Sequence, residues 1–460
     1  MPTPFLVVLS LLVVLWAVLV WRRGPQVGLA VACIAAFAMP RWYEIELAGL
    51  PFDLRSILAI IGLVGILLHP RGRIRSPLIA LDGCIAALVV VHVLSDWQQG
   101  ESLAWLPLRA YGEWALPYVA GRLCVRDGED LVKIAPWASA ILLAIGALAV
   151  FEAVAKLNLF DVVFGSPIDV RGEDGEKFPR NVLRYGMLRA LGPTEHSIFY
   201  GLLQILLLPW AAIQLRAGLS RPAKTLGAAA LIFGVLGTVA TLSRGPILGL
   251  LLAGGFGLAV WSKWLRWPLA IVALVAAGAL VARPAEVLTR LGNTVDEQRF
   301  KTDVELYGRR YEMNGTMNRY LIVLAYAPAI KSGGFLGHGT EATNQFPPRV
   351  TPLPPPVEER DLLTVPDNAY LMMGLRFGWL GLLSLTLLMT AAIVTACRLV
   401  RERSLIGSPG WLAACLFAAA AILLTVYPSY DYVFELLFTV GLVGGLRSFG
   451  VASERGRPVR

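Results

Sequence analysis

Long apolar stretches, separated by short polar connectors, divide the chain along most of its length. Many of them approach the ~20 residues that a helix needs to cross ~30 Å of hydrocarbon. The second stretch is short and the fifth contains Arg109, Glu113 and Pro117, so the pattern predicts 11–13 membrane-spanning helices. The stretches are Phe5–Trp21, Val27–Pro40, Ser56–His69, Leu78–Ser95, Leu103–Gly121, Ile134–Ala155, Ser197–Leu215, Thr225–Ser243, Pro246–Trp261, Trp267–Ala282, Ala369–Ala396, Trp411–Tyr427 and Tyr432–Leu446.

Composition supports this interpretation. Hydrophobic residues make up 56% of the chain and charged residues 16%, with a mean hydropathy of +0.64. Soluble domains usually carry about 25% charged residues. The sequence therefore predicts an all-α polytopic membrane protein. Phe5–Trp21 lacks a preceding basic residue and a small-residue cleavage site, so we interpret it as a true span and not as a signal peptide.

The distribution of charge predicts the orientation in the membrane. Basic residues concentrate in alternate connectors and in the tail, which together hold 20 of the 41 lysines and arginines. By the positive-inside rule these segments face the cytoplasm. We therefore expect an inner-membrane protein with a periplasmic N-terminus and a cytoplasmic C-terminus. The net charge of +9 then reflects topology, which argues against nucleic-acid binding.

Two long connectors fall on the predicted periplasmic side. The predicted organisation is a block of N-terminal spans (1–155), a first periplasmic loop (156–196), central spans (197–282), a large periplasmic loop (283–366), and C-terminal spans with the tail (367–460). Basic and acidic residues balance within both loops. Any function of an arginine there must depend on its position. The large loop is expected to be partly helical, with a helix from Gly308 to Ile330, and to contain an extended proline-rich run from Thr351 to Arg360.

Familiar nucleotide-binding, zinc-protease and serine-hydrolase motifs are absent from the sequence. The four histidines are scattered, and the five cysteines form no C-x-x-C pair, which argues against a metal site or a disulfide framework. Chemistry must then come from arginines, carboxylates and at most one histidine at the outer face. The segments that stand out are Arg189–His196 (RALGPTEH), Thr241–Pro246 (TLSRGP), Arg319–Tyr320, Gly333–Gly339 (GGFLGHG), Pro366–Leu371 (PDNAYL) and Gly378–Gly381 (GWLG).

The order and placement of these motifs resemble the O-antigen ligase and polymerase superfamily of membrane glycosyltransferases. The resemblance covers about Arg189 to Gly381, and in the N-terminal third it is limited to Pro117–Arg122. It implies a GT-C-like helical fold and a donor glycan carried on a polyprenyl diphosphate, such as undecaprenyl diphosphate. It also implies transfer at the periplasmic face without a metal or another cofactor.

The resemblance assigns roles to particular residues. Arg189, Arg244 and Arg319 are expected to bind the donor diphosphate, because guanidinium groups match phosphate geometry and stay charged beside lipid. Candidates for the base that activates the acceptor hydroxyl are Asp367, Glu195 and His338. Further candidates for the site are His196, Asn368 and Tyr370.

One position departs from the pattern of the core ligases. These enzymes typically have histidine before the asparagine of the [HD]-N-x-Y-L segment, and this chain has Asp367. A carboxylate also accepts a proton. The departure favours a polymerase of exopolysaccharide or O-antigen over a ligase that attaches glycan to lipid A-core or protein.

Structural roles compete with the catalytic ones. Arg189 and Arg244 are also suited to anchoring at the interface, and Asp367, Glu195 and His196 to capping helices. Arg319 is suited to pairing with Glu312, and Arg109 with Glu113, four residues apart on one helix face. Other ionisable residues within apolar stretches are candidates for internal polar contacts. These are Asp82, Glu152, Arg376 and Glu435.

Two other functions are compatible with such a chain. One is a transporter or flippase of lipid-linked glycans, and the other is a non-enzymatic partner in polysaccharide export. Transporters often show internal repeats and broken helices around a mid-membrane site, whereas this chain has no evident repeat and its distinctive residues lie in outer loops. For the glycosyltransferase we expect membrane lipid and a lipid-linked or glycan acceptor as further ligands, with a chain-length regulator as a possible protein partner.

Overall fold

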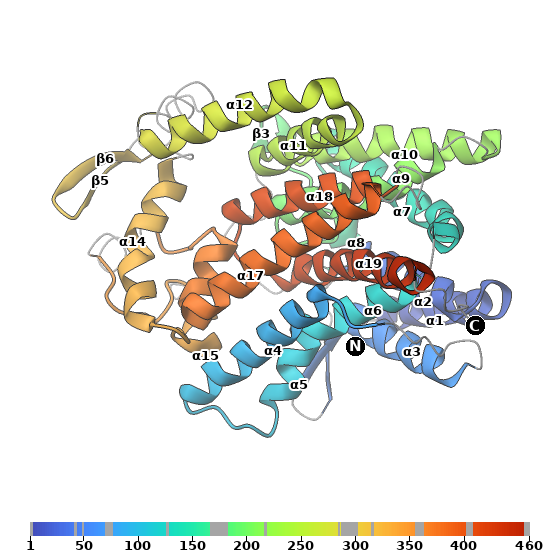
Figure 1. The fold of residues 1–460 in the computed structure, drawn as a ribbon, viewed down its shortest axis with the longest axis horizontal. Helices are drawn as coiled ribbons and strands as arrows, with labels where there is room; N and C mark the ends of the chain where they lie inside the picture. Colours follow the sequence, from blue (N-terminus) through green and yellow to red (C-terminus); the bar gives the residue numbers. More distant parts are fainter. Residues whose placement is uncertain are drawn as a thin grey trace.

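The structure is a computed structural model. It describes residues 3–40, 44–47, 50–69, 77–125, 128–165, 183–215, 219–283, 286, 302–313, 317–354, 363–401 and 408–454. Each predicted span is helical in this structure. Figure 1 shows the helices stacked across the molecule, with the hairpin β5–β6 and helices α14 and α15 at one end. The helices at the predicted spans are α1 (Thr3–Arg23), α2 (Pro25–Phe37), α3 (Leu54–Leu68), α4 (Ala80–Gln98), α5 (Leu106–Ala110) with the π-helix η1 (Tyr111–Ala115) and α6 (Leu116–Cys124), α7 (Gly128–Ala155), α9 (Ser197–Gln214), α10 (Arg221–Ala240), α11 (Arg244–Trp261), α12 (Lys263–Ala282), α17 (Ala369–Arg401), α18 (Ser408–Ile422) with the 3-10 helix η2 (Leu423–Thr425), and α19 (Tyr430–Glu454).

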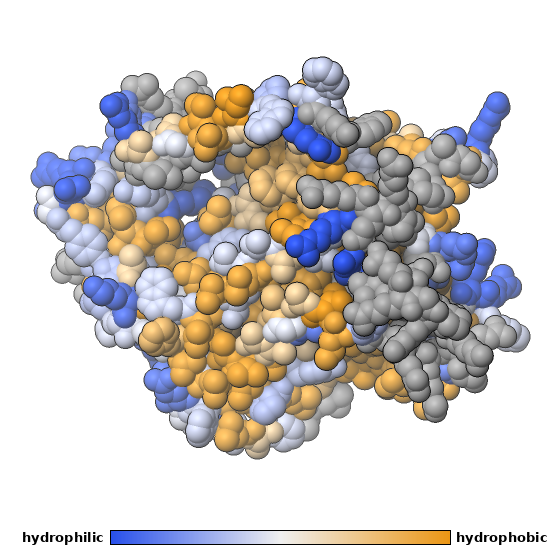
Figure 2. Space-filling model, in the orientation of Figure 1, coloured by the Kyte–Doolittle hydropathy of each residue, from blue (hydrophilic) through white to orange (hydrophobic). Residues whose placement is uncertain are grey.

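The prediction of an all-α polytopic membrane protein is confirmed. Within the described residues, six helices have the length and composition to cross a membrane, namely α1, α4, α7, α9, α10 and α17. Large hydrophobic side chains point outward from the bundle, among them Leu11 at 63% exposure and Leu251 at 67%. Figure 2 shows hydrophobic side chains over much of the visible face and hydrophilic ones concentrated towards its left and right edges. Such outward-facing apolar surface suits contact with lipid.

Helix α9 forms the centre of the bundle. Of its residues 94% are buried, against 11–44% for the other five candidate spans. It packs against α7, α10, α11, α18 and α19. A Cβ at Gly146 of α7 would lie 2.4 Å from the carbonyl oxygen of Phe233 in α10, so only glycine permits that approach. Small residues at helix contacts are a usual means of close packing within membranes.

The connectors contain short elements of their own. These are β1 (Glu44–Leu47) with β2 (Leu50–Asp53), α8 (Leu159–Phe164), β3 (Leu183–Arg184) with β4 (Met187–Leu188), β5 (Thr302–Leu306) with β6 (Arg309–Met313), α14 (Met317–Gly333) and α15 (Gly339–Thr343). The helix predicted from Gly308 is wrong at its start. Tyr307 and Gly308 both have positive φ, 52° and 75°, and form the two-residue turn of the antiparallel hairpin β5–β6.

Two glycine motifs that lie far apart in the sequence fit against each other. Gly378 interrupts α17 with φ 64° and ψ −157°. The backbone N–H groups of Trp379 and Leu380 donate to the carbonyls of Gly334 and Phe335, both at 3.1 Å. A side chain at Gly378 would collide with that backbone at 2.5 Å. The loop after α14 is therefore fixed directly on the kink of α17.

Buried ionic contacts join the helices internally, as predicted for several residues. Arg55 of α3 lies 2.8 Å from Glu435 of α19, and both side chains are 1% exposed. Asp82 accepts a hydrogen bond from Tyr118 and pairs with Arg122. These contacts confirm the predicted polar roles of Glu435 and Asp82.

The predicted pairing of Arg109 with Glu113 is wrong. Arg109 instead lies 3.2 Å from Glu101, and Glu113 lies 3.7 Å from both His92 and Arg376. The cause is the π-helical turn from Tyr111 to Ala115. Its wider turn removes the alignment of side chains four residues apart on which the prediction relied.

The orientation in the membrane stays a prediction. Several other predictions concern residues outside the described part of the chain. These residues are Arg71, Arg73, Arg75, Arg126, Arg216, Arg403, Arg455, Arg457 and Arg460 of the basic connectors and tail, the middle of the first long loop (166–182), and positions 355–360 of the proline-rich run.

Removing one member of the buried pair should destabilise the protein strongly. We expect Glu435→Ala to lower the free energy of unfolding by about 3–5 kcal/mol, since the buried charge of Arg55 would lose this carboxylate. Replacing both residues by leucine should recover most of this loss. The measurement is the thermal unfolding midpoint in detergent. Arg283→Ala is the control, because its pairing with Glu286 is largely exposed and such pairs contribute about 1 kcal/mol or less. A similar loss in both single variants would contradict this explanation.

Candidate functional site

A buried carboxylate holds the loop that precedes α9. Glu152, near the end of α7 and 3% exposed, accepts hydrogen bonds from the backbone N–H groups of Leu191 (2.9 Å) and Gly192 (3.0 Å). Asn158 donates to the carbonyl of Gly192 at 3.3 Å. Gly192 has φ +53° and rests on the ring of Tyr200, so a side chain there would collide with the ring. These contacts confirm the predicted polar role of Glu152 and fix the backbone between Arg189 and His196.

The same loop is joined to the turn between α10 and α11. Nη2 of Arg189 donates to Oγ of Ser243 at 2.8 Å, and Ser243 also lies 2.9 Å from Oγ of Ser197 at the start of α9. Arg184 donates to the carbonyl of Leu242 at 2.8 Å. Arg244, the first residue of α11, follows Ser243 directly. The motifs RALGPTEH and TLSRGP therefore meet around one serine hydroxyl.

A third segment reaches this turn through Thr425, at the end of η2. Nη2 of Arg319, on α14, lies 3.4 Å from the carbonyl oxygen of Thr425. The hydroxyl of Thr425 faces the first turn of α11, where a Cβ at Gly245 would lie 2.8 Å from Oγ1. Arg319 and Arg244 therefore approach each other across Thr425.

The four arginines form one electrostatic unit, here named the arginine cluster: Arg184, Arg189, Arg244 and Arg319. Burial lowers the pKa of Arg189 to about 10, helped by the positive charges of Arg184 and Arg319. Burial also lowers the pKa of Arg319, and the charge of Arg244 acts in the same direction. Partly desolvated like charges repel each other, so such a cluster attracts anions.

Arg184 was not among the predicted site residues. Basic and acidic residues balance in its loop, so the charge pattern of the sequence did not distinguish Arg184 from the other charged residues there. The only local signal is its position at the tight turn between β3 and β4, where Tyr185 and Gly186 have positive φ.

Asp367 lies beside the arginine cluster. Burial raises the pKa of Asp367 to about 6, and the charge of Arg319 opposes this rise. The helix-capping role considered for Asp367 belongs to its neighbour, because Oδ1 of Asn368 accepts from the N–H of Leu371 at 3.1 Å. Asp367 is therefore available for another role. Tyr370 contacts α18 by donating to the carbonyl of Ala420 at 3.2 Å.

His196 and His338 have defined structural contacts. His196 caps α9, with Nδ1 accepting from the N–H of Ile198 at 3.2 Å, which confirms that alternative. Burial lowers the pKa of His196 to about 4, and Arg189 and Arg319 contribute, so the imidazole is neutral at pH 7. His338 lies in the glycine-rich segment Gly333–Gly339 after α14, here named the glycine loop. Its Nε2 is 2.8 Å from the carbonyl oxygen of Ala329. The structure thus brings His196 and Asp367 to the arginine cluster and ties His338 to α14.

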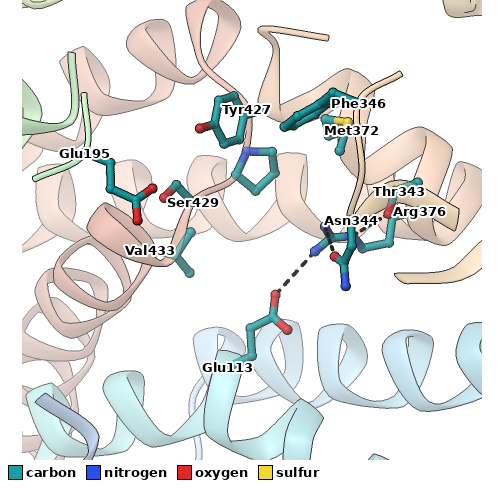
Figure 3. A pocket seen from close by; sticks show the side chains of 11 residues that line it. Glu113, Glu195, Thr343, Asn344, Phe346, Met372, Arg376, Tyr427, Ser429 and Val433 are labelled. Carbon is teal, nitrogen blue, oxygen red and sulfur yellow. Dashed lines mark hydrogen bonds and ion pairs between the residues drawn. The ribbon is translucent and has the colours of Figure 1, made fainter. Parts of the chain in front are cut away.

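A polar pocket of about 190 Å³ opens next to the cluster. Figure 3 shows Glu195 and Ser429 on one side, Tyr427 and Phe346 on another, and Glu113 facing Arg376. Nη1 of Arg376 lies 3.7 Å from Glu113, and its other nitrogens donate to Thr343 (2.9 Å) and Asn344 (3.3 Å). Of these residues only Glu195 was predicted to belong to the site. The remaining lining residues are Met372, Pro428 and Val433.

One segment of the chain matches a known protein family. Residues 229–386 match the family model described as O-antigen ligase. This segment, about a third of the chain, is similar to the O-antigen ligase and polymerase superfamily. The matched segment includes Arg244, Arg319 and Asp367, whereas Arg189 and His196 precede it. A comparison with curated proteins found no match. The match supports activity of the ligase or polymerase type in general.

Asp367→Asn should stabilise the folded protein near neutral pH. Because folding raises the pKa of Asp367, the carboxyl favours folding while it is protonated, and this contribution is lost as the pH rises through about 6. Asparagine is neutral at every pH and avoids the loss. We expect a higher unfolding midpoint for the variant at pH 7–8 and a smaller difference at pH 4. Glu341→Gln changes an exposed carboxylate of α15 and serves as the control. A lower midpoint for Asp367→Asn at pH 7–8 would contradict the effect of burial.

Proposed function

We propose that this protein is a glycosyltransferase at the periplasmic face of the bacterial inner membrane. It transfers a glycan from undecaprenyl diphosphate to a sugar hydroxyl and acts as a polymerase of exopolysaccharide or O-antigen, with a GT-C-like arrangement of helices. The observation that carries the proposal is the convergence of Arg184, Arg189, Arg244 and Arg319 from three separate segments beside one half-buried carboxyl.

The arginine cluster suits the departing diphosphate. When the bond between the anomeric carbon and the diphosphate oxygen breaks, negative charge grows on that oxygen. Fixed guanidinium groups stabilise the developing charge more than they stabilise the bound donor, which lowers the barrier. Diphosphate is a good leaving group, so the step needs no general acid. We infer that it also needs no metal; within the described residues, no three His, Cys, Asp or Glu side chains are grouped as metal ligands would be.

Asp367 is the base we propose for the acceptor hydroxyl. The hydroxyl loses its proton as its oxygen attacks the anomeric carbon from the side opposite the diphosphate, which inverts that centre. A base works best when its pKa lies near the working pH, and the value of about 6 for Asp367 meets this condition. Glu195, in the adjacent pocket, is the alternative base.

The nature of the acceptor separates the proposed polymerase from its alternative. A polymerase extends another lipid-linked repeat, and a chain-length regulator is then a suitable partner. A ligase attaches the glycan to lipid A-core or protein, and the description of the matching family favours that alternative. We favour the polymerase because Asp367 occupies the position at which core ligases typically have histidine.

Arg244 should bind the diphosphate by shape as well as charge. Arg244→Lys preserves the charge but loses the planar pair of donors that contacts two phosphate oxygens. We expect it to lower transfer about 10-fold or more, since one charge-assisted hydrogen bond contributes ~1.5–3 kcal/mol, and Arg244→Ala should lower transfer further. The measurement is glycan production in a deletion strain, with membrane protein levels checked by blot.

The matched control is Arg349→Lys, which changes an exposed arginine in the large loop. It should leave glycan production unchanged. Full activity of Arg244→Lys would refute recognition by shape. Full activity of Arg244→Ala as well would remove Arg244 from the donor site.

The rate of transfer should depend on the ionisation of Asp367. Since a base acts only when deprotonated, kcat/KM should fall as the pH drops below about 6. Asp367→Asn should lower transfer by about 10²–10⁴ and abolish this dependence in the activity that remains. The assay uses purified protein with lipid-linked donor across pH 5–8. Near-normal transfer by Asp367→Asn would shift the role of base to Glu195.

A further inference from the structure

We propose that the pocket beside the arginine cluster holds the terminal sugar of the acceptor. The sugar would stack on Phe346 and Tyr427, and the buried pair of Glu113 and Arg376 would bind its hydroxyls. This inference rests on the proposed function, because it supplies the second substrate for the same transfer.

The aromatic rim fits one face of a sugar ring. The rings of Phe346 and Tyr427 lie 5.2 Å apart, centroid to centroid, in an edge-to-face arrangement. Phe346 is 40% exposed although it lies at a pocket. The C–H groups of a pyranose form an apolar face that packs on aromatic rings, which combine large contact area with little conformational freedom.

The opposite side of the pocket fits sugar hydroxyls. The side chains of Glu113 and Arg376 are 6% and 9% exposed, so the protein keeps two desolvated charges at this place. Buried ionic groups are costly in a membrane protein and usually serve a function. A carboxylate accepts from hydroxyl groups and a guanidinium donates to them, so the pair can bind two neighbouring hydroxyls at once. The amide of Asn344 and the hydroxyl of Ser429 add further partners.

These groups are held in place before any ligand binds. The carbonyl of Arg376 accepts from Ser95 of α4 at 3.0 Å. Asp96 of α4 accepts from the N–H of Thr340 at 2.7 Å, which fixes α15 and the residues that follow it. Next to Glu113, Trp114 donates to His92 at 3.0 Å. A preorganised site loses less entropy on binding, which favours specific recognition of a small polar ligand.

The position of the pocket fits delivery of the acceptor to the donor. Glu195 lines it, and the next residue, His196, lies within the electrostatic field of Arg189 and Arg319. Tyr427 follows two residues after Thr425, whose carbonyl accepts from Arg319. The volume of about 190 Å³ is far larger than the ~10–15 Å³ that a single water molecule needs. This space suits one sugar residue and leaves the rest of the glycan outside.

Binding of an oligosaccharide without donor tests the inference. The probe is the repeat-unit oligosaccharide released by mild acid from the cell's own polysaccharide, added to the purified full-length protein and measured by saturation-transfer NMR. We expect the unaltered protein to bind it. Glu113→Gln should weaken binding about 10-fold or more, and Phe346→Leu about threefold or more. In transfer assays, Phe346→Leu should raise KM for the acceptor and leave kcat nearly unchanged.

Two controls keep the outcomes distinct. Phe335→Leu makes the same change at a phenylalanine that is 72% exposed and does not line the pocket, so binding should be unchanged. Arg244→Ala should lower transfer more than 10-fold and still bind the oligosaccharide. The inference is overturned if the unaltered protein binds none at millimolar concentration, or if Glu113→Gln and Phe346→Leu bind it normally. In either case, loss of transfer by Arg244→Ala would leave the proposed function intact. If the pocket variants lose binding while Arg244→Ala transfers normally, the donor site is wrong and the sugar pocket stands.

Discussion

The contact of Glu152 with the backbone of Leu191 and Gly192 is the constraint on which the site depends. Buried backbone N–H groups outside a helix need hydrogen-bond partners, because an unsatisfied buried group costs free energy comparable to a lost hydrogen bond. One buried carboxylate satisfies both N–H groups. It thereby sets the path of the loop that carries Arg189, Glu195 and His196 onto α9. Since α9 is also the centre of the bundle, this contact links the site to the core.

The close fit of backbones extends this order to the rest of the site. The glycine loop after α14 lies directly on the kink of α17 at Gly378. That contact sets the position of α14, which carries Arg319, against α17, which follows Asp367. The short contact of Gly245 with Thr425 aligns the start of α11 with both. Close packing of glycines against backbone thus positions the charged side chains of the site, although these side chains contribute little to that packing.

The site contains interactions that do not favour the folded state. Burial and the charges of Arg184 and Arg319 lower the pKa of Arg189, burial and the charge of Arg244 lower the pKa of Arg319, and burial raises the pKa of Asp367. Shifted pKa values of this kind are expected at a site that binds an anion and transfers a proton. Their cost is offset by the large apolar contact area between the helices. The contacts that stabilise the fold therefore lie mainly between the helices, and the residues proposed for function lie at the site.

The sequence alone determined the membrane-spanning helices, because hydrophobic runs are a local property and lipid admits few backbone solutions. It also indicated Arg189, Arg244 and Arg319, since their motifs occur in a characteristic order. The tertiary structure decided which residues come together. Arg319 and Thr425 are 106 positions apart, and no periodicity within one segment predicts their contact. The π-helical turn directed Glu113 towards Arg376, and the hairpin β5–β6 replaced part of a predicted helix. Pairing between distant segments depends on the packing of whole helices, and that information lies in the fold.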